Sequence, residues 1–494
     1  MSSRNYLSWI ILILLLCLYM FFPSGSSTTD AWYYAACVRY QDEIFHPHHL
    51  LYNLLGYVFC LLPSKAGIDV LASLKVLNSL FAVSALIVIQ RILRMLGYDR
   101  ILMIVVTCLC GFSFSVMRYA TENETYIVPL FFAFAASYSL LQYFRSGEDK
   151  SLLSAAVWIT MAVLFHQVYI FWWIGFFVSF ILAGKKRPLL IYLFISLSGP
   201  LVYLLVIRNV RGDLQLSTIT DFILGDLREG GNMNTGGKGM IFSIINLFRS
   251  YVQVHGYIFN LIKSNILYVI PGIVAAGIAA YSLFGLPLKA EKVSDPRFAY
   301  THLLIIILQF IFAALASGNA EFMVMIPVLT FILVPLFTRK CERFFVAVLA
   351  GIAVWNISYG LIPLHYKSDA PEQFLCGEAF SNSGIIVVAS DDQLLRNMLY
   401  YQTGVTDIGN IYRSPANMRI KGLDPATLVD VIDDALASGS TVYTDCTGPA
   451  AVSRASITEG RMNEAFFRIY ELIPVRTWPS AMGTRTVFRV MRKM

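Results

Sequence analysis

The sequence predicts an α-helical polytopic membrane protein of about 11 spans with a small C-terminal α/β domain, because its apolar runs are long enough to cross a bilayer. Hydrophobic residues make up 57% of the 494-residue chain, and charged residues only 14%. The mean hydropathy of +0.63 is too high for an ordinary soluble protein. Past residue 364 the long apolar runs give way to short apolar segments that alternate with polar ones, as in a soluble α/β domain.

The distribution of Lys and Arg predicts which side of the membrane each connection lies on. The net charge is +7, and Lys and Arg gather in the short connections at residues 97–100, 145–150, 185–187, 289–297 and 339–343. This is the positive-inside pattern, so the charge does not indicate a nucleic-acid partner. Arg4 precedes the first apolar run and no small-residue cleavage site follows it, which predicts a retained first span with a cytoplasmic N-terminus. Because the predicted number of spans is odd, we expect the C-terminal domain to lie outside. We expect the protein to lie in the plasma or inner membrane.

The predicted spans follow from the long apolar runs. They cover residues 6–22, 70–96, 101–116, 125–144, 152–183, 188–207, 266–286, 300–316, 322–337 and 344–361. The run 152–183 is too long for one span, and the polar break at Phe165–Gln167 divides it into two. The apolar segment 49–63 is short for a span and predicts an interfacial or re-entrant helix. Residues 208–240 form a polar, Gly-rich outer stretch, and the amphipathic segment 241–260 is compatible with an interfacial or an embedded position.

These runs divide the chain into a transmembrane domain at 1–363, whose first outer loop spans 24–69, and an extracytoplasmic domain at 364–494. In the second domain, apolar residues 384–390 and 440–445 predict buried strands. Capped helical patterns follow at 391–401 and 424–439. No motif in this domain decides between an acceptor-binding module and a structural cap.

The first outer loop carries an unusual density of ionisable and aromatic side chains. Asp30 lies just past the first span, where a carboxylate could act as a general base or hold a divalent metal. Its place before an apolar-periodic stretch is equally compatible with a helix N-cap. Trp32 and Arg39 fall at helical spacing, which predicts a short surface helix that also includes Tyr33. We expect these three side chains to contact the substrate.

Three of the seven histidines stand close together at His46, His48 and His49. Their spacing lacks the i, i+4 relation that puts two metal ligands on one helix face, which argues against a zinc site. Hydrogen bonds to a phosphate or to sugar hydroxyls are the favoured function, and anchoring at the membrane interface is the structural alternative.

Further ionisable residues gather at the outer ends of the spans, where they either serve function or simply reach water. Two are acidic candidates for catalysis, Glu122 and Glu124. The candidates for binding substrate are Arg118, His166, Arg208, Arg211 and Glu321. His166 is notable because it interrupts an otherwise apolar run, although a hydrogen-bonded core histidine is the structural alternative. The two arginines near 210 are suitable clamps for a lipid-linked phosphate.

In their order along the chain, these motifs resemble the GT-C superfamily of polytopic glycosyltransferases, which includes protein O-mannosyltransferases and lipid A aminoarabinose transferases. The resemblance covers roughly the first 340 residues and rests on DAWYYAACVRY at 30–40, HPHHLLY at 46–52, residues 74–94, RYATENETY at 118–126 and AEFMVMIPVL at 320–329. The chain departs from the pattern in having a single Asp in the first loop, and His166–Gln167 where many relatives have a Lys.

The resemblance implies an enzyme that transfers a sugar from a polyprenyl-phosphate carrier to a hydroxyl of a protein, glycan or lipid acceptor on the outer face. It implies Asp30 as the catalytic base, Glu122 or Glu124 as a second acidic residue, and a divalent metal such as Mg²⁺ or Mn²⁺ as a candidate cofactor. A glycan polymerase or ligase is an alternative that Arg208 and Arg211 keep open. A flippase or transporter for a lipid-linked sugar is another, although it should show internal repeats and charges near the midplane.

Overall fold

The computed structural model describes residues 6–493 apart from 230–236, 285, 287–292, 317, 339–341, 382–383, 407, 449–453 and 480–482. The basic connections predicted at Lys289, Lys292, Arg339 and Lys340 therefore lie outside the described residues. By their internal contacts the rest divides into two compact units. The first holds residues 1–23, 43–253 and 271–360, and the second holds residues 24–42, 254–270 and 361–494.

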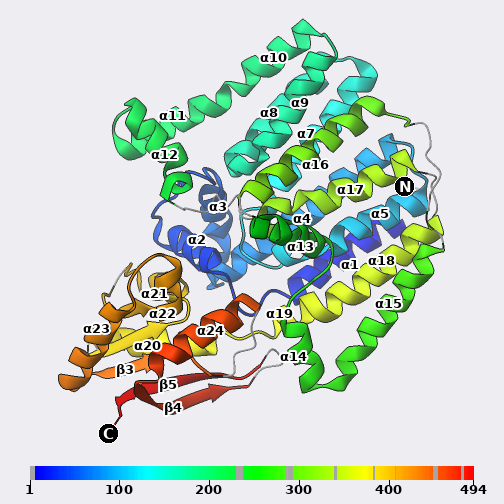
Figure 1. Cartoon of the computed structure of the whole chain (residues 1–494). Coiled ribbons are helices and arrows are strands. Elements are labelled where there is room, and N and C mark those ends of the chain that lie inside the picture. Colours follow the sequence, from blue (N-terminus) through cyan, green and yellow to red (C-terminus); the bar gives the residue numbers. More distant parts are fainter. Residues whose placement is uncertain are drawn as a thin grey trace. The chain divides into compact units, whose positions relative to one another are not determined.

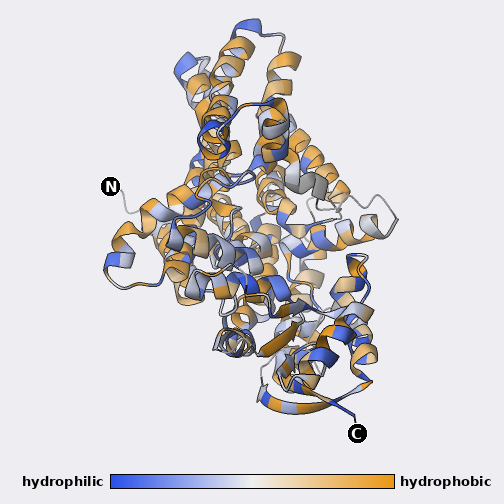
Figure 2. Ribbon diagram, turned by 90° about the vertical axis from the view of Figure 1, so that its left-hand side faces the viewer, coloured by the Kyte–Doolittle hydropathy of each residue, from blue (hydrophilic) through white to orange (hydrophobic). Residues whose placement is uncertain are grey.

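The first unit is helical throughout (Figure 1). Its helices are α1 (Tyr6–Phe21), α3 (Tyr52–Lys65), α4 (Val70–Met95), α5 (Arg100–Phe112), α6 (Phe114–Ala120), α7 (Ile127–Ser146), α8 (Asp149–Phe165), α9 (Ile170–Leu182), α10 (Lys186–Ser196), α11 (Ser198–Arg211), α12 (Leu216–Glu229), α13 (Gly237–Tyr251), α15 (Val269–Leu283), α16 (Pro296–Leu315), α17 (Met325–Phe337) and α18 (Glu342–Asn356). Hydrophobic residues dominate the helical ribbons (Figure 2). Within the described residues, seven helical segments are long and apolar enough to span a membrane, or eight if the bent pair α5–α6 is one span. The predicted multi-pass membrane fold is confirmed, whereas the count of eleven stays a prediction.

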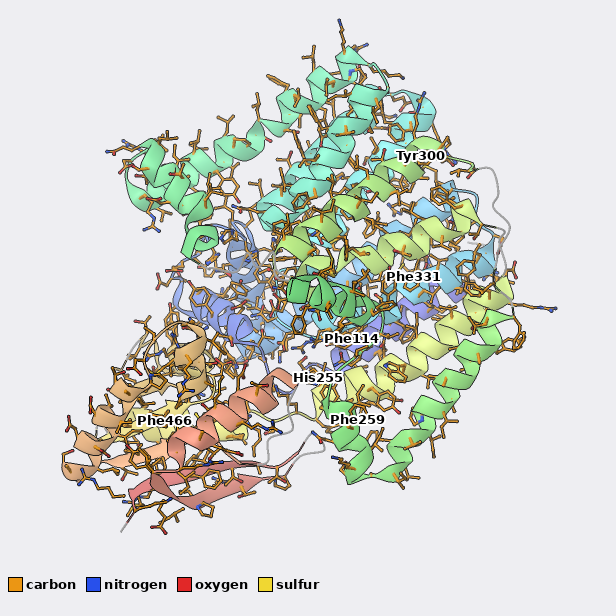
Figure 3. All side chains as sticks on the ribbon, viewed as in Figure 1. Phe114, His255, Phe259, Tyr300, Phe331 and Phe466 are labelled. Carbon is orange, nitrogen blue, oxygen red and sulfur yellow. The ribbon has the colours of Figure 1, made fainter. Side chains whose placement is uncertain are left out.

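The helices are bent or broken at two points within the predicted spans. The third span bends by 64° between α5 and α6 at Ser113, just before Phe114 (Figure 3). The predicted break in the run 152–183 is confirmed, because α8 ends at Phe165 and a short 3₁₀ helix at Gln167–Tyr169 leads into α9. The predicted outer stretch 208–240 contains the amphipathic helix α12, which its Gly-rich composition did not predict.

Close helix packing holds the first unit together. Helix α7 lies along both α8 and α4, and α9 lies along α16. A Cβ atom at Gly175 of α9 would collide with Ile305 of α16, so the absence of a side chain permits this approach. Phe331 of α17 meets Tyr251 edge to face with ring centroids 5.6 Å apart (Figure 3). Helices α4, α6 and α7 also contact one another, so the loop between α6 and α7 begins and ends on helices that pack against α4.

The second unit is built on a mixed five-stranded sheet of order β2-β1-β3-β5-β4. Its strands are β1 (Ile385–Ala389), β2 (Ile411–Arg413), β3 (Thr441–Thr444), β4 (Tyr470–Trp478) and β5 (Arg485–Arg492). β1 pairs in parallel with β2 and β3, whereas β5 is antiparallel to both β3 and β4. The helices of the unit are α2 (Thr29–Tyr40), α14 (Tyr257–Ser264), α19 (Ile362–His365), α20 (Ala370–Ser381), α21 (Asp392–Thr403), α22 (Pro415–Ile420), α23 (Ala426–Ala437) and α24 (Arg454–Phe467).

The core of this domain packs helices α23 and α24 on the sheet. Val388, Val442 and Val490 come from adjacent strands and are buried with Ile432, while Phe466 of α24 packs against the same cluster (Figure 3). The predicted strands and helices of the α/β domain are all present. Its two cysteines, at 376 and 446, are buried free thiols rather than a disulfide pair.

Candidate active site

The first unit buries an acidic loop between α6 and α7. The Glu122 side chain is 0% exposed, and its carboxylate lies 3.5 Å from Lys75 of α4 and 3.5 Å from Arg118 of α6. A buried carboxylate is tolerated only when cations or hydrogen bonds compensate its lost hydration. Arg118, which the sequence suggested for substrate binding, therefore has an internal carboxylate as a partner.

Asn78 fixes the backbone of the same loop. Its amide nitrogen donates to the carbonyl oxygens of Glu122 and Glu124, each at 2.7 Å. The hydroxyl of Tyr52 on α3 donates to Oδ1 of Asn123 at 2.8 Å. Both carboxylate residues of the loop are thus held from two neighbouring helices, and Glu124 is buried as well.

The sequence analysis did not select Lys75 or Asn78, although a sign of their importance was present. They are spaced i, i+3 within an otherwise apolar span, which places both on one face of α4. Polar and ionisable residues are costly within membrane helices and are retained mainly where they meet a partner. That pattern could have identified them as the partners of a buried carboxylate.

Glu321 lies in the 3₁₀ helix Ala320–Met323, directly before α17. Its carboxylate accepts a hydrogen bond of 2.9 Å from the hydroxyl of Tyr126, which follows the acidic loop. The Tyr126 ring lies 5.1 Å from that of Tyr119 and 4.9 Å from that of His166. Tyr126 therefore links Glu321 to the histidines described next.

Four histidines meet in the first unit. The ring of His166 lies 4.2 Å from that of His49, which lies 5.7 Å from that of His46. His48 hydrogen-bonds Gln167 at 3.0 Å, so the loop 43–51 is tied to the break between α8 and α9. Residues that the sequence suggested separately as substrate-binding thus form one histidine cluster.

The cluster contains an unused hydrogen-bond donor. Nδ1 of His166 accepts from the backbone N–H of Val168, which leaves the proton of a neutral ring on Nε2. That Nε2 atom is buried and has no hydrogen-bond partner among the described residues. Burial, with His48 and His46 beside it, lowers the pKa of His166 to about 3. Burial and the adjacent His166 also hold the pKa of His49 well below its usual range. Both rings are therefore neutral near pH 7.

An apolar groove with a volume of about 960 Å³ opens between helices α8 to α12. Its lining includes Leu164, Trp173, Phe194 and Tyr203. The Tyr203 hydroxyl donates to the carbonyl of Pro47 at 3.0 Å and accepts from Gln167 at 3.2 Å. One end of the groove therefore reaches the loop that carries the histidine cluster.

Asp30 belongs to the second unit, on α2. The N-cap of this helix is Thr28, whose side chain accepts from the N–H of Ala31 at 3.1 Å. Asp30 occupies the first turn and is exposed, so the helix does not use its carboxylate as the cap. The predicted short helix is present and carries Trp32, Tyr33 and Arg39, whereas its position at the membrane surface stays a prediction.

The two candidate arginines near 210 lie at the end of α11. Arg208 donates to the carbonyl of Gly212 at 2.9 Å, which satisfies a terminal helix carbonyl. Arg211 lies over the ring of Phe222 at 6.0 Å. Both are exposed.

Among the described residues, the structure shows no site for the predicted divalent metal, which stays a prediction. Two cations already compensate Glu122. In the described part of the chain, no three His, Cys, Asp or Glu side chains are placed to share an ion. A metal site commonly needs several such donors in one coordination shell.

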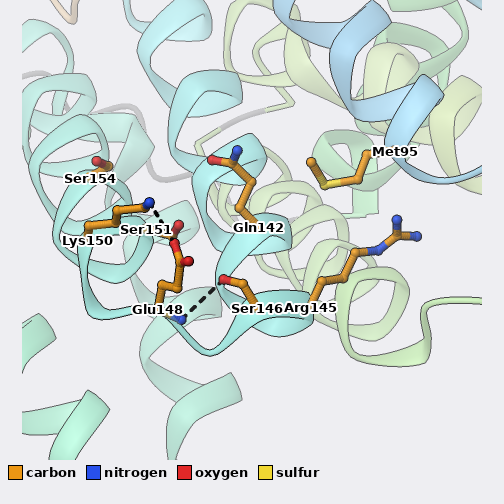
Figure 4. Close-up of a pocket in the computed structure, with 8 residues that line it drawn as sticks. All are labelled: Met95, Gln142, Arg145, Ser146, Glu148, Lys150, Ser151 and Ser154. Carbon is orange, nitrogen blue, oxygen red and sulfur yellow. Dashed lines mark hydrogen bonds and ion pairs between the residues drawn. The ribbon is translucent and has the colours of Figure 1, made fainter.

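A smaller cavity of about 490 Å³ lies where α7 ends and α8 begins (Figure 4). It is lined by Met95, Gln142, Arg145, Ser146, Glu148, Lys150, Ser151 and Ser154. Lys150 pairs with Glu148 at 2.9 Å. Because α7 has 20 residues, this cavity is about 30 Å from the acidic loop and is not part of the candidate site.

Comparison with solved structures identifies the class of fold. ArnT from Cupriavidus metallidurans, solved bound to undecaprenyl phosphate, superposes with a TM-score of 0.55 at 10% identity over 99% of this chain and 98% of that one. An oligosaccharyltransferase of Archaeoglobus fulgidus, solved with Zn and sulfate, gives a TM-score of 0.50 at 14% identity over 98% and 73%. No family model and no curated protein matches the sequence. The chain is thus a multi-pass membrane protein with the GT-C fold, as its motifs predicted.

Proposed function

We propose that the protein is a membrane glycosyltransferase that moves a sugar from a polyprenyl-phosphate-linked donor to a hydroxyl of a glycan, lipid or protein acceptor. The supporting observation is the orphaned, buried N–H of His166 close to the polar end of the apolar groove. A polyprenyl phosphate has the matching chemistry, because its chain is apolar and its head accepts hydrogen bonds. The GT-C fold, shared with a protein solved with undecaprenyl phosphate, agrees with this assignment.

In this proposal the exposed carboxylate of Asp30 is the general base. It takes the proton of the acceptor hydroxyl while the hydroxyl oxygen bonds to the anomeric carbon of the donor sugar. The bond between that carbon and the phosphate oxygen breaks, and polyprenyl phosphate leaves with the electron pair. Attack on the face opposite the leaving group inverts the anomeric centre.

The contacts of the acidic loop favour different functions for its two glutamates. The carboxylate of Glu122 is neutralised by Lys75 and Arg118, so we assign it to holding the loop in place. We assign Glu124, which is buried in the same loop, as the second acidic residue that orients the donor. Glu321 supports the same layer through Tyr126.

We assign the histidine cluster to the phosphate of the donor. The neutral imidazoles of His49 and His166, with His46 and His48 beside them, can donate hydrogen bonds to phosphate oxygens without a positive charge of their own. Hydrogen bonds to the leaving phosphate strengthen as negative charge develops on it, which lowers the barrier. Arg208 and Arg211 remain candidates for a weaker, solvent-exposed contact with the same group.

The topology completes the proposal. We place the N-terminus in the cytoplasm, and Asp30, the histidine cluster and residues 364–494 outside, on the basis of the positive-inside pattern. Single cysteines at exposed positions test this orientation through labelling with a membrane-impermeant maleimide. Labelling of a cysteine at Gln402 in intact cells is expected, and labelling only after lysis would overturn the orientation.

The direct test is sugar transfer in membranes supplied with polyprenyl-phosphate-linked sugars, comparing the wild type with Asp30→Asn. Glu148→Gln, at the remote cavity, is the matched control, and immunoblots equalise protein levels. We expect transfer by the wild type and the control, with a loss of at least about 100-fold in Asp30→Asn. If the wild type transfers none of several donors, the proposed activity is wrong and a lipid-linked sugar transporter becomes the better candidate.

A further inference from the structure

Helix α2 packs along α21, a helix that follows it by more than 350 residues in the sequence. Both belong to the second unit. The helix that carries Asp30 is therefore part of the same compact unit as the C-terminal α/β domain.

Polar contacts fix the N-terminal turn of α2, directly beside Asp30. The amide nitrogen of Asn397 donates to the carbonyl oxygen of Thr29 at 2.9 Å. The Thr29 hydroxyl in turn donates to Asp391 at 3.4 Å. Asn397 is buried, so this hydrogen bond is shielded from water and from competition by solvent.

Aromatic contacts fix the rest of the helix. The ring of Tyr401 lies 5.2 Å from that of Trp32, edge to face, and 4.9 Å from the guanidinium of Arg39. The Tyr40 ring stacks on Tyr400 at 5.6 Å, and its hydroxyl donates to the carbonyl of Tyr401 at 3.1 Å. Trp32 and Arg39 are thus engaged in helix packing.

A further hydrogen bond closes the C-terminal end of α2. The Tyr400 hydroxyl donates to the carboxylate of Asp42 at 3.0 Å. Asp42 follows Gln41, whose backbone adopts a positive φ of 58° to end the helix. Both ends of α2 and its middle therefore contact a single helix.

Helix α21 is itself anchored to the sheet. It follows β1 directly, and Asp391 caps it by accepting from the N–H of Leu394 at 3.0 Å. Arg413, at the end of β2, makes two hydrogen bonds to the buried carboxylate of Asp392, at 3.1 and 3.3 Å. Such a two-point contact restrains orientation as well as distance. Because α21 cannot easily shift on the sheet, the helix packed against it is restrained too.

We infer that α21 is a positioning element for Asp30, with Asn397, Tyr400 and Tyr401 as the positioning residues. The inference rests on the proposed function, in which Asp30 is the base. It also assigns a function to the C-terminal domain, for which the sequence did not decide between acceptor binding and a structural cap. Small displacements of a catalytic group lower the rate sharply, so loosening α2 should slow transfer even though none of these residues touches the reacting atoms.

The test combines kinetics with amide hydrogen exchange on the full-length protein in detergent. Asn397→Asp keeps the shape of the side chain but places an acceptor opposite the carbonyl of Thr29. Tyr400→Phe removes only the hydroxyl that reaches Asp42. Gln402→Ala, exposed on the same helix, is the matched control.

We expect faster exchange of the amides of residues 29–40 in both variants, and normal exchange in the control. The kcat for transfer should fall about tenfold in Asn397→Asp, with the KM for the lipid-linked donor unchanged. A general loss of folding would instead accelerate exchange in β1 and β3 as well.

The outcomes separate this inference from the proposed function. If the wild type shows no transfer, the proposed function fails, and the exchange data still decide whether α21 restrains α2. Unchanged exchange in residues 29–40 of both variants overturns the inference whatever the activity. Faster exchange with an unchanged kcat overturns the positioning of Asp30 by α21.

Discussion

Two of the three acidic candidates, Glu122 and Asp30, occupy opposite environments. In the first unit, Glu122 is fully buried and lies between two cations, whereas in the second unit Asp30 is exposed on the first turn of a helix. A carboxylate of the first kind contributes to stability through its partners and is poorly suited to exchanging a proton. A carboxylate of the second kind contributes little to stability and can accept a proton from a substrate. The comparison therefore supports the proposal that Glu122 is a structural acid and Asp30 the catalytic one.

The largest effect on stability is expected from the cation beside the buried acid. Lys75→Met removes one of the two partners of Glu122, and loss of a buried ion-pair partner costs about 3 kcal/mol of unfolding free energy. Thermal unfolding in detergent measures the loss. Lys65→Met, at the exposed end of α3, is the control and should change the free energy by less than about 0.5 kcal/mol. Equal stability of the two variants would show that Glu122 does not depend on Lys75.

A somewhat smaller effect is expected from the amide that holds the acidic loop. Asn78→Ala leaves the carbonyls of Glu122 and Glu124 without their buried donor, at a cost of about 2 kcal/mol. Denaturant unfolding followed by tryptophan fluorescence measures it. Ser84→Ala, which removes a hydroxyl from the exposed side of the same helix, should be nearly neutral. A neutral Asn78→Ala would mean that the loop keeps its conformation without this donor.

The histidine cluster predicts a pH dependence of stability. Because burial depresses the pKa of His166 and His49, the unfolded chain binds protons more readily than the folded one below pH 6.5. The contribution of these neutral histidines to the free energy of unfolding is then complete above pH 6.5. It decreases as the pH drops, by about 1.4 kcal/mol per pH unit for each histidine. Melting temperatures between pH 5 and 8 measure the slope, and His166→Asn should reduce it. The same substitution at His365, in the second unit, is the control; equal slopes in the two variants would exclude His166 as the source.

Local patterns in the sequence were sufficient for much of the fold. The break at His166 was predictable because a polar pair interrupts a long apolar run, and α2 was predictable from the spacing of Trp32 and Arg39. The bend at Ser113 was not, since the residues on both sides of it are apolar and their pattern is continuous.

The candidate site was only partly predictable from the sequence. The sequence indicated His49 and His166 as separate candidates, but their contact across 117 positions depends on how the loop 43–51 returns to α8. It could not assign Lys75 to Glu122 or pair Asn397 with Thr29, because these contacts follow from the three-dimensional arrangement of helices. Residue type and spacing identified where ionisable groups gather, and the structure was needed to show which of them already have partners.

The most direct test of this separation measures transfer and melting temperature together for Asp30→Asn and Glu122→Gln. The account predicts that Asp30→Asn loses transfer by about 100-fold or more at an unchanged melting temperature. Glu122→Gln should lower the melting temperature by several degrees, because it leaves Lys75 and Arg118 without their shared anion. The account would be contradicted if Asp30→Asn transferred sugar at the rate of the wild type. It would also be contradicted if the melting temperature of Asp30→Asn fell as far as that of Glu122→Gln.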